Sequence, residues 1–314
     1  MRSPLVSHQT ATPSHSFETP ATGLKSEQNG DVSYSKILVP LDGSSLAERV
    51  LPYVRALRIG YGTPVELLRV FSPAPQGLAD PAHGLYQHQI DASLHADARD
   101  YLNSVKRSID GPELTVTSTV EEGDPASWIV DKAEKELGTI IAMSTHGRSG
   151  IARSVLGSVT DKVMHATNSP LLVVGSRDEQ VPVFEVEFKQ VIVPLDGSKL
   201  AESVLPHVIT LAKSLRLTAV LVKVTCHREE AESRDYLLEV GERLHQQGVS
   251  SIENVTLHGC PSDAIVDIGR QIQNSLVAMT THGRSGIMRW LLGSVTDRVV
   301  RESGDPVLIV RPFH

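Results

Sequence analysis

Ser144 to Val163 reads S-T-H-G-R-S-G-I-A-R-S-V-L-G-S-V-T-D-K-V, and the chain repeats it at Thr280 to Val299 as T-T-H-G-R-S-G-I-M-R-W-L-L-G-S-V-T-D-R-V. The two copies match at 15 of 20 positions without a gap. Shared helix or strand propensity does not produce identity at this level, so the chain contains a duplicated site and not only a duplicated scaffold.

The repeated stretch has the pattern of a strand end, a glycine-rich loop and a helix start. Thr139 to Thr145 is a short apolar run, typical of a strand buried on both faces, and the loop begins at His146. Ser158 lies three residues before Asp161, which predicts a capped helix N-terminus. Backbone N–H groups and the positive end of a helix dipole bind anions, so the stretch predicts a phosphate site.

The bulk composition is that of a globular protein with room for two domains. The 314 residues are 40% hydrophobic and 21% charged, with a formal net charge of −7. No apolar run reaches about 18 residues, so no membrane-spanning helix is expected, and the acidic balance argues against general nucleic-acid binding. Cys226 and Cys260 form no ligand-like cluster, and we expect reduced thiols in a cytoplasmic protein.

The first repeat alternates strands and helices after a tail rich in Ser, Thr, Pro and His, which predicts disorder. We expect Ser44 to cap the first helix and Pro52 to kink it, while Asp124 and Pro125 open a later helix. The predicted strands are 36–41, 65–71, 114–120, 139–145 and 170–174. The other predicted helices are 90–109, 126–137 and one that ends near residue 166.

The pattern begins again at Val191 to Val208, which matches Ile37 to Val54 at 13 of 18 positions. Each repeat therefore predicts an α/β domain, a five-stranded parallel sheet with helices on both faces. The expected organisation is a disordered tail at 1–34, a first domain at 35–176, a short extended linker at 177–188 and a second domain at 189–314.

The repeats differ in length between the first aspartate and the histidine of the loop. Asp42 precedes His146 by 104 residues and Asp196 precedes His282 by 86, so the first repeat holds 18 additional residues. We assign these residues to a loop at 72–88 beside the crevice.

Both repeats place an aspartate directly after the first strand. In a doubly wound sheet the first and fourth strands are neighbours where the strand order reverses, and ligands bind beyond their carboxyl ends. Asp42 is therefore expected beside the loop that starts at Ser144, and Asp196 beside the equivalent loop. An acid that accepts ribose or base hydrogens next to a phosphate loop is an arrangement suited to a nucleotide.

At this point the chain resembles the universal stress protein family in its tandem form, over about residues 36–175 and 189–312. The resemblance rests on V-P-L-D-G-S after the first strand, on G-D-P-A from Gly123, and on H-G-R-S-G with a G-S pair separated from its first glycine by nine residues. ATP-binding members carry G-x2-G-x9-G-[ST] here. Both repeats fit this pattern except at the leading glycine, where Ser144 and Thr280 stand.

The resemblance implies two tandem Rossmann-like domains of the adenine nucleotide alpha hydrolase-like type. It further implies ATP as the ligand, with Mg²⁺ as a companion, in a stress-response regulator or sensor with little or no hydrolysis and no catalytic residues. The implied nucleotide-binding residues are Pro40, Asp42, Ser144, His146, Gly147, Arg148, Gly150, Gly157, Ser158, Pro194, Asp196, Thr280, His282, Gly283, Arg284, Gly286, Gly293 and Ser294.

Purely structural interpretations of the same residues stay open. The glycines serve turns and close packing, Ser158 and Ser294 cap helices, and Asp42 completes a turn in that interpretation. Arg148 is then a solvated loop charge, and His146 has a structural hydrogen bond, since no Ser or Cys nucleophile pattern lies nearby.

Two other function classes share this architecture. A nucleotidyl-transfer enzyme or ATP pyrophosphatase carries S-G-G-x-D-S or H-x-G-H, and the sequence has neither, nor any metal-spaced group. A scaffold that acts only through dimerisation is favoured by the altered leading glycine. We expect the two domains to pack as a pseudo-dimer within the chain, with a further homodimer left open and without nucleic-acid or membrane partners.

Overall fold

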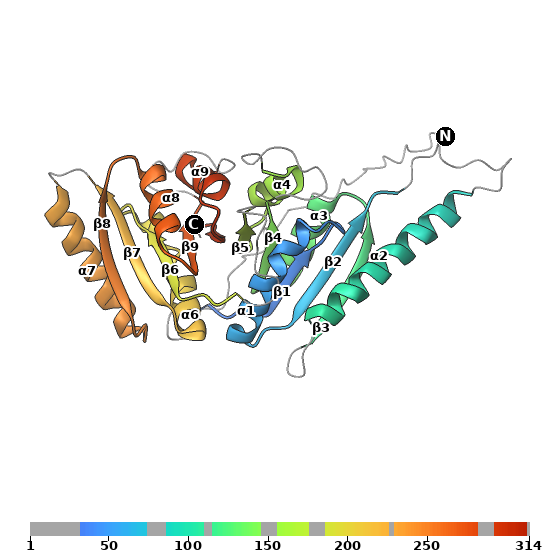
Figure 1. Cartoon of the computed structure of the whole chain (residues 1–314), viewed down its shortest axis with the longest axis horizontal. Helices are drawn as coiled ribbons and strands as arrows, with labels where there is room; N and C mark the ends of the chain where they lie inside the picture. The colour runs from blue at the N-terminus through green and yellow to red at the C-terminus, as the bar shows by residue number, and fades with distance from the viewer. Residues whose placement is uncertain are drawn as a thin grey trace, which may run out of the picture.

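The structure, a computed structural model, describes residues 32–73, 86–109, 115–145, 156–175, 186–225, 229–281 and 292–312. Its strands form one ten-stranded sheet, to which each half of the chain contributes five (Figure 1). The first half supplies β1 (Lys36–Pro40), β2 (Val65–Phe71), β3 (Val116–Glu122), β4 (Thr139–Ser144) and β5 (Leu171–Val174). The second half supplies β6 (Gln190–Pro194), β7 (Thr218–Thr225), β8 (Ile252–His258), β9 (Ser275–Thr280) and β10 (Val307–Val310).

Helices cover both faces of this sheet. The first half holds the 3₁₀ helix η1 (Ala47–Val50), α1 (Leu51–Tyr61), α2 (Gln87–Ile109), α3 (Pro125–Lys135) and α4 (Ser158–Ala166). The second half holds α5 (Lys199–Glu202), α6 (Leu205–Leu215), α7 (Glu230–Gln246), α8 (Pro261–Gln271) and α9 (Ser294–Glu302). Neither these nor any other described helix is long and apolar enough to cross a membrane.

The strand order is β3-β2-β1-β4-β5-β10-β9-β6-β7-β8. Pairing within each half is parallel, whereas β5 and β10 pair antiparallel, with Leu172 opposite Leu308. The two halves are thus related by a pseudo-twofold axis between β5 and β10, and each supplies the edge that the other covers. In each half the order reverses beside the first strand, between β1 and β4 and between β6 and β9. The predicted fold class is confirmed.

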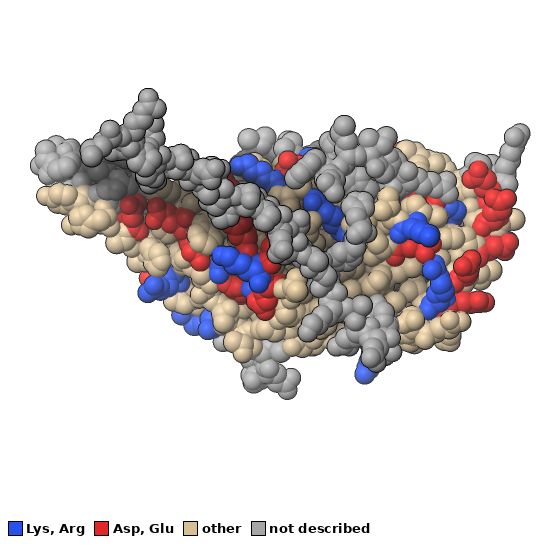
Figure 2. Space-filling view, turned by 180° about the vertical axis from the view of Figure 1, so that it is seen from behind, with Lys and Arg blue, Asp and Glu red and all other residues tan. Residues whose placement is uncertain are grey.

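The alternation of side chains along each buried strand divides the core into two layers. Ile37 and Val39 face one layer with residues of α1, α2, α6 and α7, and Leu38 faces the other with residues of α3, α4, α8 and α9. Both layers run through both halves, so the sheet is buried on both faces as parallel sheets require. Figure 2 shows basic and acidic side chains interspersed on one face of the surface, with acidic ones gathered at the α7 and β8 end.

The interior prolines do not kink a helix, contrary to the prediction. Pro52 lies in the first turn of α1, directly after η1, and Pro206 lies in the first turn of α6, after the short α5. A proline at the start of a helix leaves no hydrogen bond unmade, because the first-turn N–H groups have no partner within the helix. Each proline therefore begins a new helix.

The loop assignment for the 18 additional residues is wrong in part. Residues 72–86 connect β2 to α2, while residues 226–229 connect β7 to α7, so 11 additional residues lie in this connection. Six more lengthen α2 relative to α7, and one lies before β3. Residues 74–85 are outside the described part of the chain, as are residues 177–185 of the predicted linker.

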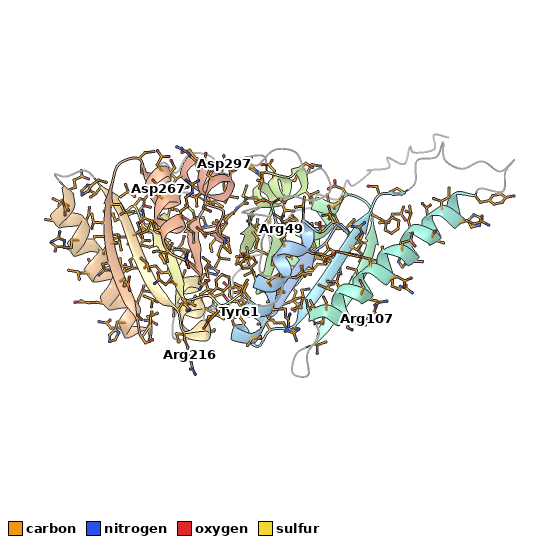
Figure 3. All side chains as sticks on the ribbon, viewed as in Figure 1. Arg49, Tyr61, Arg107, Arg216, Asp267 and Asp297 are labelled. Carbon is orange, nitrogen blue, oxygen red and sulfur yellow. The ribbon has the colours of Figure 1, made fainter. Side chains whose placement is uncertain are left out.

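The predicted tail extends too far, because residues 32–34 pack against the second half of the chain. The backbone N–H of Val32 donates to Thr210 Oγ1 at 3.0 Å, and the Thr210 hydroxyl donates to Val32 O at 2.9 Å. Tyr34 lies between α1 and α6, where its hydroxyl is 2.7 Å from His207 Nδ1 and its ring is 4.8 Å from that of Tyr61. Tyr61 marks this junction of the two halves in Figure 3.

His207 is buried at this junction, with 1% of its surface exposed. Burial lowers the pKa of His207 to about 4, since the charged imidazole is disfavoured away from water. Its Nε2 has no hydrogen-bond partner among the described residues. The imidazole is therefore neutral in the folded protein at neutral pH.

We expect His207 to make the folded chain less stable as the pH falls from about 6.5 to about 4. In this window the unfolded chain binds a proton at His207 and the folded chain does not, so the slope reaches about 1.4 kcal/mol per pH unit. Urea unfolding of His207→Gln across this window is expected to show a shallower slope. The exposed His245 supplies the matched variant His245→Gln. An equal loss of slope in both variants would contradict the assignment to His207.

Candidate functional site

The two aspartates of the predicted site each close a tight turn at the end of a central strand. Asp42 Oδ1 accepts hydrogen bonds from the backbone N–H of Ser44 at 2.9 Å and from its hydroxyl at 2.6 Å. Asp196 Oδ1 accepts one from the N–H of Ser198 at 2.9 Å. Both carboxylates are half-buried. Each aspartate therefore stabilises its own turn, and these hydrogen bonds fix the direction of its carboxylate.

Ser44 and Ser198 begin the segments that follow these turns. The Ser44 hydroxyl oxygen accepts a hydrogen bond from the N–H of Ala47, and the Ser198 hydroxyl oxygen accepts one from that of Ala201, each at 3.1 Å. Ser198 is the N-cap of α5, as its sequence position predicts. Ser44 makes the same bond at the start of η1. Pro40 and Pro194, which end β1 and β6, are half-buried beneath these turns.

The neighbouring strand end is tied to the start of α4. Gly157 N donates to Thr145 O at 2.6 Å, and the Thr160 hydroxyl donates to Ser144 O at 2.9 Å. The second half repeats both bonds, from Gly293 N to Thr281 O at 2.7 Å and from the Thr296 hydroxyl to Thr280 O at 2.8 Å. Sequence analysis missed the two threonines, although T-D occurs in both copies of the repeated stretch.

Ser158 and Ser294 are not helix caps, which corrects the prediction. The N-cap residues are Gly157 and Gly293, which have no side chain to accept from the first turn. Ser158 and Ser294 are the first helical residues, and both are exposed. The cap residue of α4 therefore offers no side-chain acceptor to the first turn of the helix. The hydroxyl of Ser158 is exposed in that turn. This arrangement fits an anion such as phosphate.

The replaced leading glycine does not strain the backbone. Ser144 and Thr280 end β4 and β9, and among the described non-glycine residues only Arg216 and Asn274 have a positive φ. Serine and threonine are thus compatible with the conformation at these positions. Their difference lies in size and burial, because Thr280 is buried and Ser144 is half-buried.

The G-D-P-A stretch is a helix start in the structure. Asp124 is the N-cap of α3, where its Oδ2 accepts from Ser127 N at 3.0 Å. The hydrogen bonds from the backbone N–H and the hydroxyl of Ser127 lower the pKa of the Asp124 carboxyl. In the second half Cys260 stands at the equivalent position, exposed, with a free thiol and no capping bond from its side chain.

In each half the aspartate after the first strand and the helix start after the fourth thus follow the ends of adjacent parallel strands. The remaining predicted residues lie outside the described part of the chain: His146, Gly147, Arg148, Gly150, His282, Gly283, Arg284 and Gly286. Cys226 also lies outside it. No group of three His, Cys, Asp or Glu side chains within the described ranges has the geometry of a metal site.

A further set of side chains, on the α2 and α7 side of the two turns, was not among the predicted site residues. Arg69 on β2 and Lys223 on β7 each donate to a backbone oxygen of the turn region, Leu41 O and Asp196 O respectively. Neither side chain belongs to the repeated motifs. Both lie 27 residues after the aspartate of their half, and this equal spacing, together with the register of β2 and β7 beside β1 and β6, is the signal that pairs them.

Comparisons with known proteins identify relatives of both halves of the chain. The family model described as "Universal stress protein family" matches residues 33–175 and 187–311. A universal stress protein of Methanocaldococcus jannaschii is 31% identical over 148 residues, covering 47% of this chain and 85% of that protein. One from Mycolicibacterium smegmatis is 23% identical over 300 residues, covering 88% of this chain and 97% of that protein.

A solved structure has the same fold over nearly the whole length. The universal stress protein from Archaeoglobus fulgidus superposes with a TM-score of 0.70 at 22% identity, covering 91% of this chain and 99% of that one. The two matches of the family model fall on the two halves of the sheet and together cover most of the residues. The chain therefore belongs to the universal stress protein family, in a form that carries the family domain twice.

Proposed function

We propose that the chain binds ATP, one molecule in each half, and acts as a stress-response regulator or sensor with little or no hydrolysis. One observation carries this proposal. In each half a half-buried aspartate and the uncapped start of a nine-residue helix lie at the ends of adjacent parallel strands, where the strand order reverses. Open α/β sheets bind their ligands at this point.

The described residues fit an adenine nucleotide. The first-turn N–H groups of α4 and α9 and the exposed hydroxyls of Ser158 and Ser294 suit phosphate oxygens. Asp42 and Asp196 suit the hydroxyls of ribose or the amino group of adenine, because an ionised carboxylate only accepts hydrogen bonds. Mg²⁺ would neutralise the phosphate charge in this arrangement. We propose the same nucleotide contacts for the predicted site residues that lie outside the described part of the chain.

The domain boundaries and the cytoplasmic location are part of the same proposal. We place the domains at 35–176 and 189–314, joined by 177–188, in a cytoplasmic protein, with residues 32–34 packed against the second domain. The pairing of β5 with β10 already joins the two domains within one chain. A further homodimer of the whole chain stays a prediction.

The test is to denature the freshly purified chain and identify any released nucleotide by mass. The expected result is adenine nucleotide, at up to two equivalents after saturation with ATP. A chain that neither carries nor binds any nucleotide would contradict the proposal and favour a dimerisation scaffold. Rapid release of phosphate from added ATP would favour an enzyme.

We expect the first half to bind ATP more tightly than the second. Ser144 leaves more room at the strand end than Thr280, and the connection from β2 to α2 is longer than that from β7 to α7. Titration calorimetry on the full chain is the measurement, with Gly293→Val to isolate the first site and Gly157→Val to isolate the second. Equal affinities, or a tighter second site, would show that neither difference matters.

A further inference from the structure

Each half holds one basic side chain against the backbone of its aspartate turn, defined as Asp42–Ser44 or Asp196–Ser198. Arg69 Nη1 donates to Leu41 O, the residue just before the first turn, at 3.3 Å. Lys223 Nζ donates to Asp196 O, within the second turn, at 3.1 Å. Both side chains are at least half-buried, and each lies one residue beyond the last pair of the ladder between its strand and the first strand of its half.

A tyrosine of the covering helix lies over each cation. The guanidinium carbon of Arg69 is 5.8 Å from the centroid of the Tyr101 ring on α2, and Lys223 Nζ is 5.2 Å from that of the Tyr236 ring on α7. At these distances the negative face of the ring attracts the cation. The cation is thus fixed between a ring on one side and a carbonyl oxygen on the other.

The hydroxyls of the same two tyrosines each donate to a glutamate that follows the aspartate turn. Tyr101 donates to Glu48 Oε1 at 2.9 Å, and Tyr236 donates to Glu202 Oε1 at 3.0 Å. Burial and then the neighbouring glutamate raise the pKa of both Tyr101 and Tyr236, and they outweigh the charge of Arg69, which lowers that of Tyr101. The hydroxyls therefore stay protonated and act as donors at physiological pH.

These contacts hold the segment between Leu41 and Glu48 at both ends. At one end, Arg69 donates to the carbonyl oxygen of Leu41, just before the aspartate. At the other end, Tyr101 donates to Glu48, six residues after the aspartate. The second half repeats the arrangement with lysine in place of arginine. The positive charge is thus common to both halves, whereas the planar shape of the guanidinium is not.

We propose that Arg69 and Lys223 are positioning residues that aim the carboxylates of Asp42 and Asp196 at the bound nucleotide. This inference rests on the proposed function and names the residues that prepare its sites. A turn already held in the binding conformation loses less conformational freedom when the ligand binds. In this arrangement the cations act from the face of the sheet that α2 and α7 cover, where Tyr101 and Tyr236 lie, and not by contact with the nucleotide.

The test compares Arg69→Met with Arg69→Lys in the full chain. Arg69→Met keeps an unbranched apolar side chain in place of the arginine stem and removes the charge, and Arg69→Lys places in the first half the residue that the second half already uses. Amide hydrogen exchange is measured on peptides covering residues 41–47, where Ser44 N and Ala47 N are hydrogen-bonded in the turn. ATP affinity is measured with Gly293→Val in the background, so that only the first site reports.

With Arg69→Met we expect faster exchange in residues 41–47, unchanged exchange in β4, and an ATP affinity lower by about tenfold. With Arg69→Lys both quantities are expected to stay within about threefold of the parent chain. Lys223→Met is expected to affect residues 195–201 and the second site alone. If Arg69→Lys keeps the exchange rates and ATP affinity of the parent chain while Arg69→Met does not, the positive charge positions the turn. A general loss of packing would not be recovered by the charge alone.

Unchanged exchange in residues 41–47 of Arg69→Met would overturn the inference, as would faster exchange with unchanged ATP affinity. A uniform rise in exchange that includes β4 would also overturn it, since that marks general destabilisation. If the parent chain binds no adenine nucleotide, the proposed function fails and the aiming role fails with it. In that case the exchange rates still show whether the cation holds the turn.

Discussion

Gly157→Val is expected to abolish ATP binding in the first half of the chain, lowering the affinity by 100-fold or more, and to leave the second half unaffected. The glycine is the N-cap of α4 with φ −61° and ψ 143°, a conformation that any residue adopts. The substitution therefore causes no backbone strain. Its side chain instead occupies space at the helix start, where phosphate approaches the N–H groups.

Gly293→Val is the matched variant in the second half, where φ is −61° and ψ is 140°. Titration with labelled ATP is expected to give half the stoichiometry for each single variant and none for the double variant. Thermal unfolding serves as the control for the fold. A double variant that retains full stoichiometry would contradict the phosphate site at these helix starts.

Glu66→Val is expected to destabilise the folded chain by about 3 kcal/mol, because it leaves two partly buried lysines without their shared partner. Glu66 is buried on β2, with Oε2 3.0 Å from Lys36 Nζ and Oε1 2.7 Å from Lys132 Nζ. Thr119 donates to the same Oε1 at 2.8 Å. Urea unfolding followed by circular dichroism measures the change.

The second half of the chain supplies the control for this prediction. The positions equivalent to Lys36, Glu66 and Lys132 hold Gln190, Val220 and Ile268, so that half has no ion cluster there. The triple variant Lys36→Gln, Glu66→Val and Lys132→Ile is expected to recover stability to within about 1 kcal/mol of the native chain. A Glu66→Val chain as stable as the native one would show that the cluster contributes nothing.

The same glutamate predicts a separate pH dependence. Burial alone would raise the pKa of Glu66, but the hydrogen bonds from Lys132, Lys36 and Thr119 outweigh it and lower the pKa to about 2. The stabilisation is fully present above about pH 4.5 and is lost as the pH falls toward 2, because the unfolded chain then binds a proton that the folded chain does not. This window lies below that of His207, which distinguishes the two groups in a pH series.

Local patterns in the sequence predicted most of the elements of the fold. Short apolar runs bounded by turn residues located the strands, and β2 has the predicted bounds. The prediction at Pro52 was wrong because the expected single helix is divided into η1 and α1, and the one at Ser158 because a one-residue shift separates a cap from the first helical residue. Propensity does not resolve a shift of this size.

The candidate site was predictable in part, for a similar reason. Asp42, Gly157 and their counterparts belong to stretches that occur twice, so repetition alone singled them out. Arg69 and Tyr101 lie in no repeated motif, and they act on the turn through contacts between β2, α2 and the residue after β1. Contacts of this kind depend on strand register and helix packing, which single-residue patterns do not encode.

The sequence by itself determined the two repeats and the parallel sheet of each, because these follow from local order along the chain. Only the tertiary structure decided that β5 and β10 pair antiparallel, that Tyr34 reaches His207, and that Glu66 lies between two lysines. These partners are separated by 30 to 173 residues or belong to different halves. Their meeting depends on how complete elements pack, since burial of the shared core and not local propensity selects which surfaces come together.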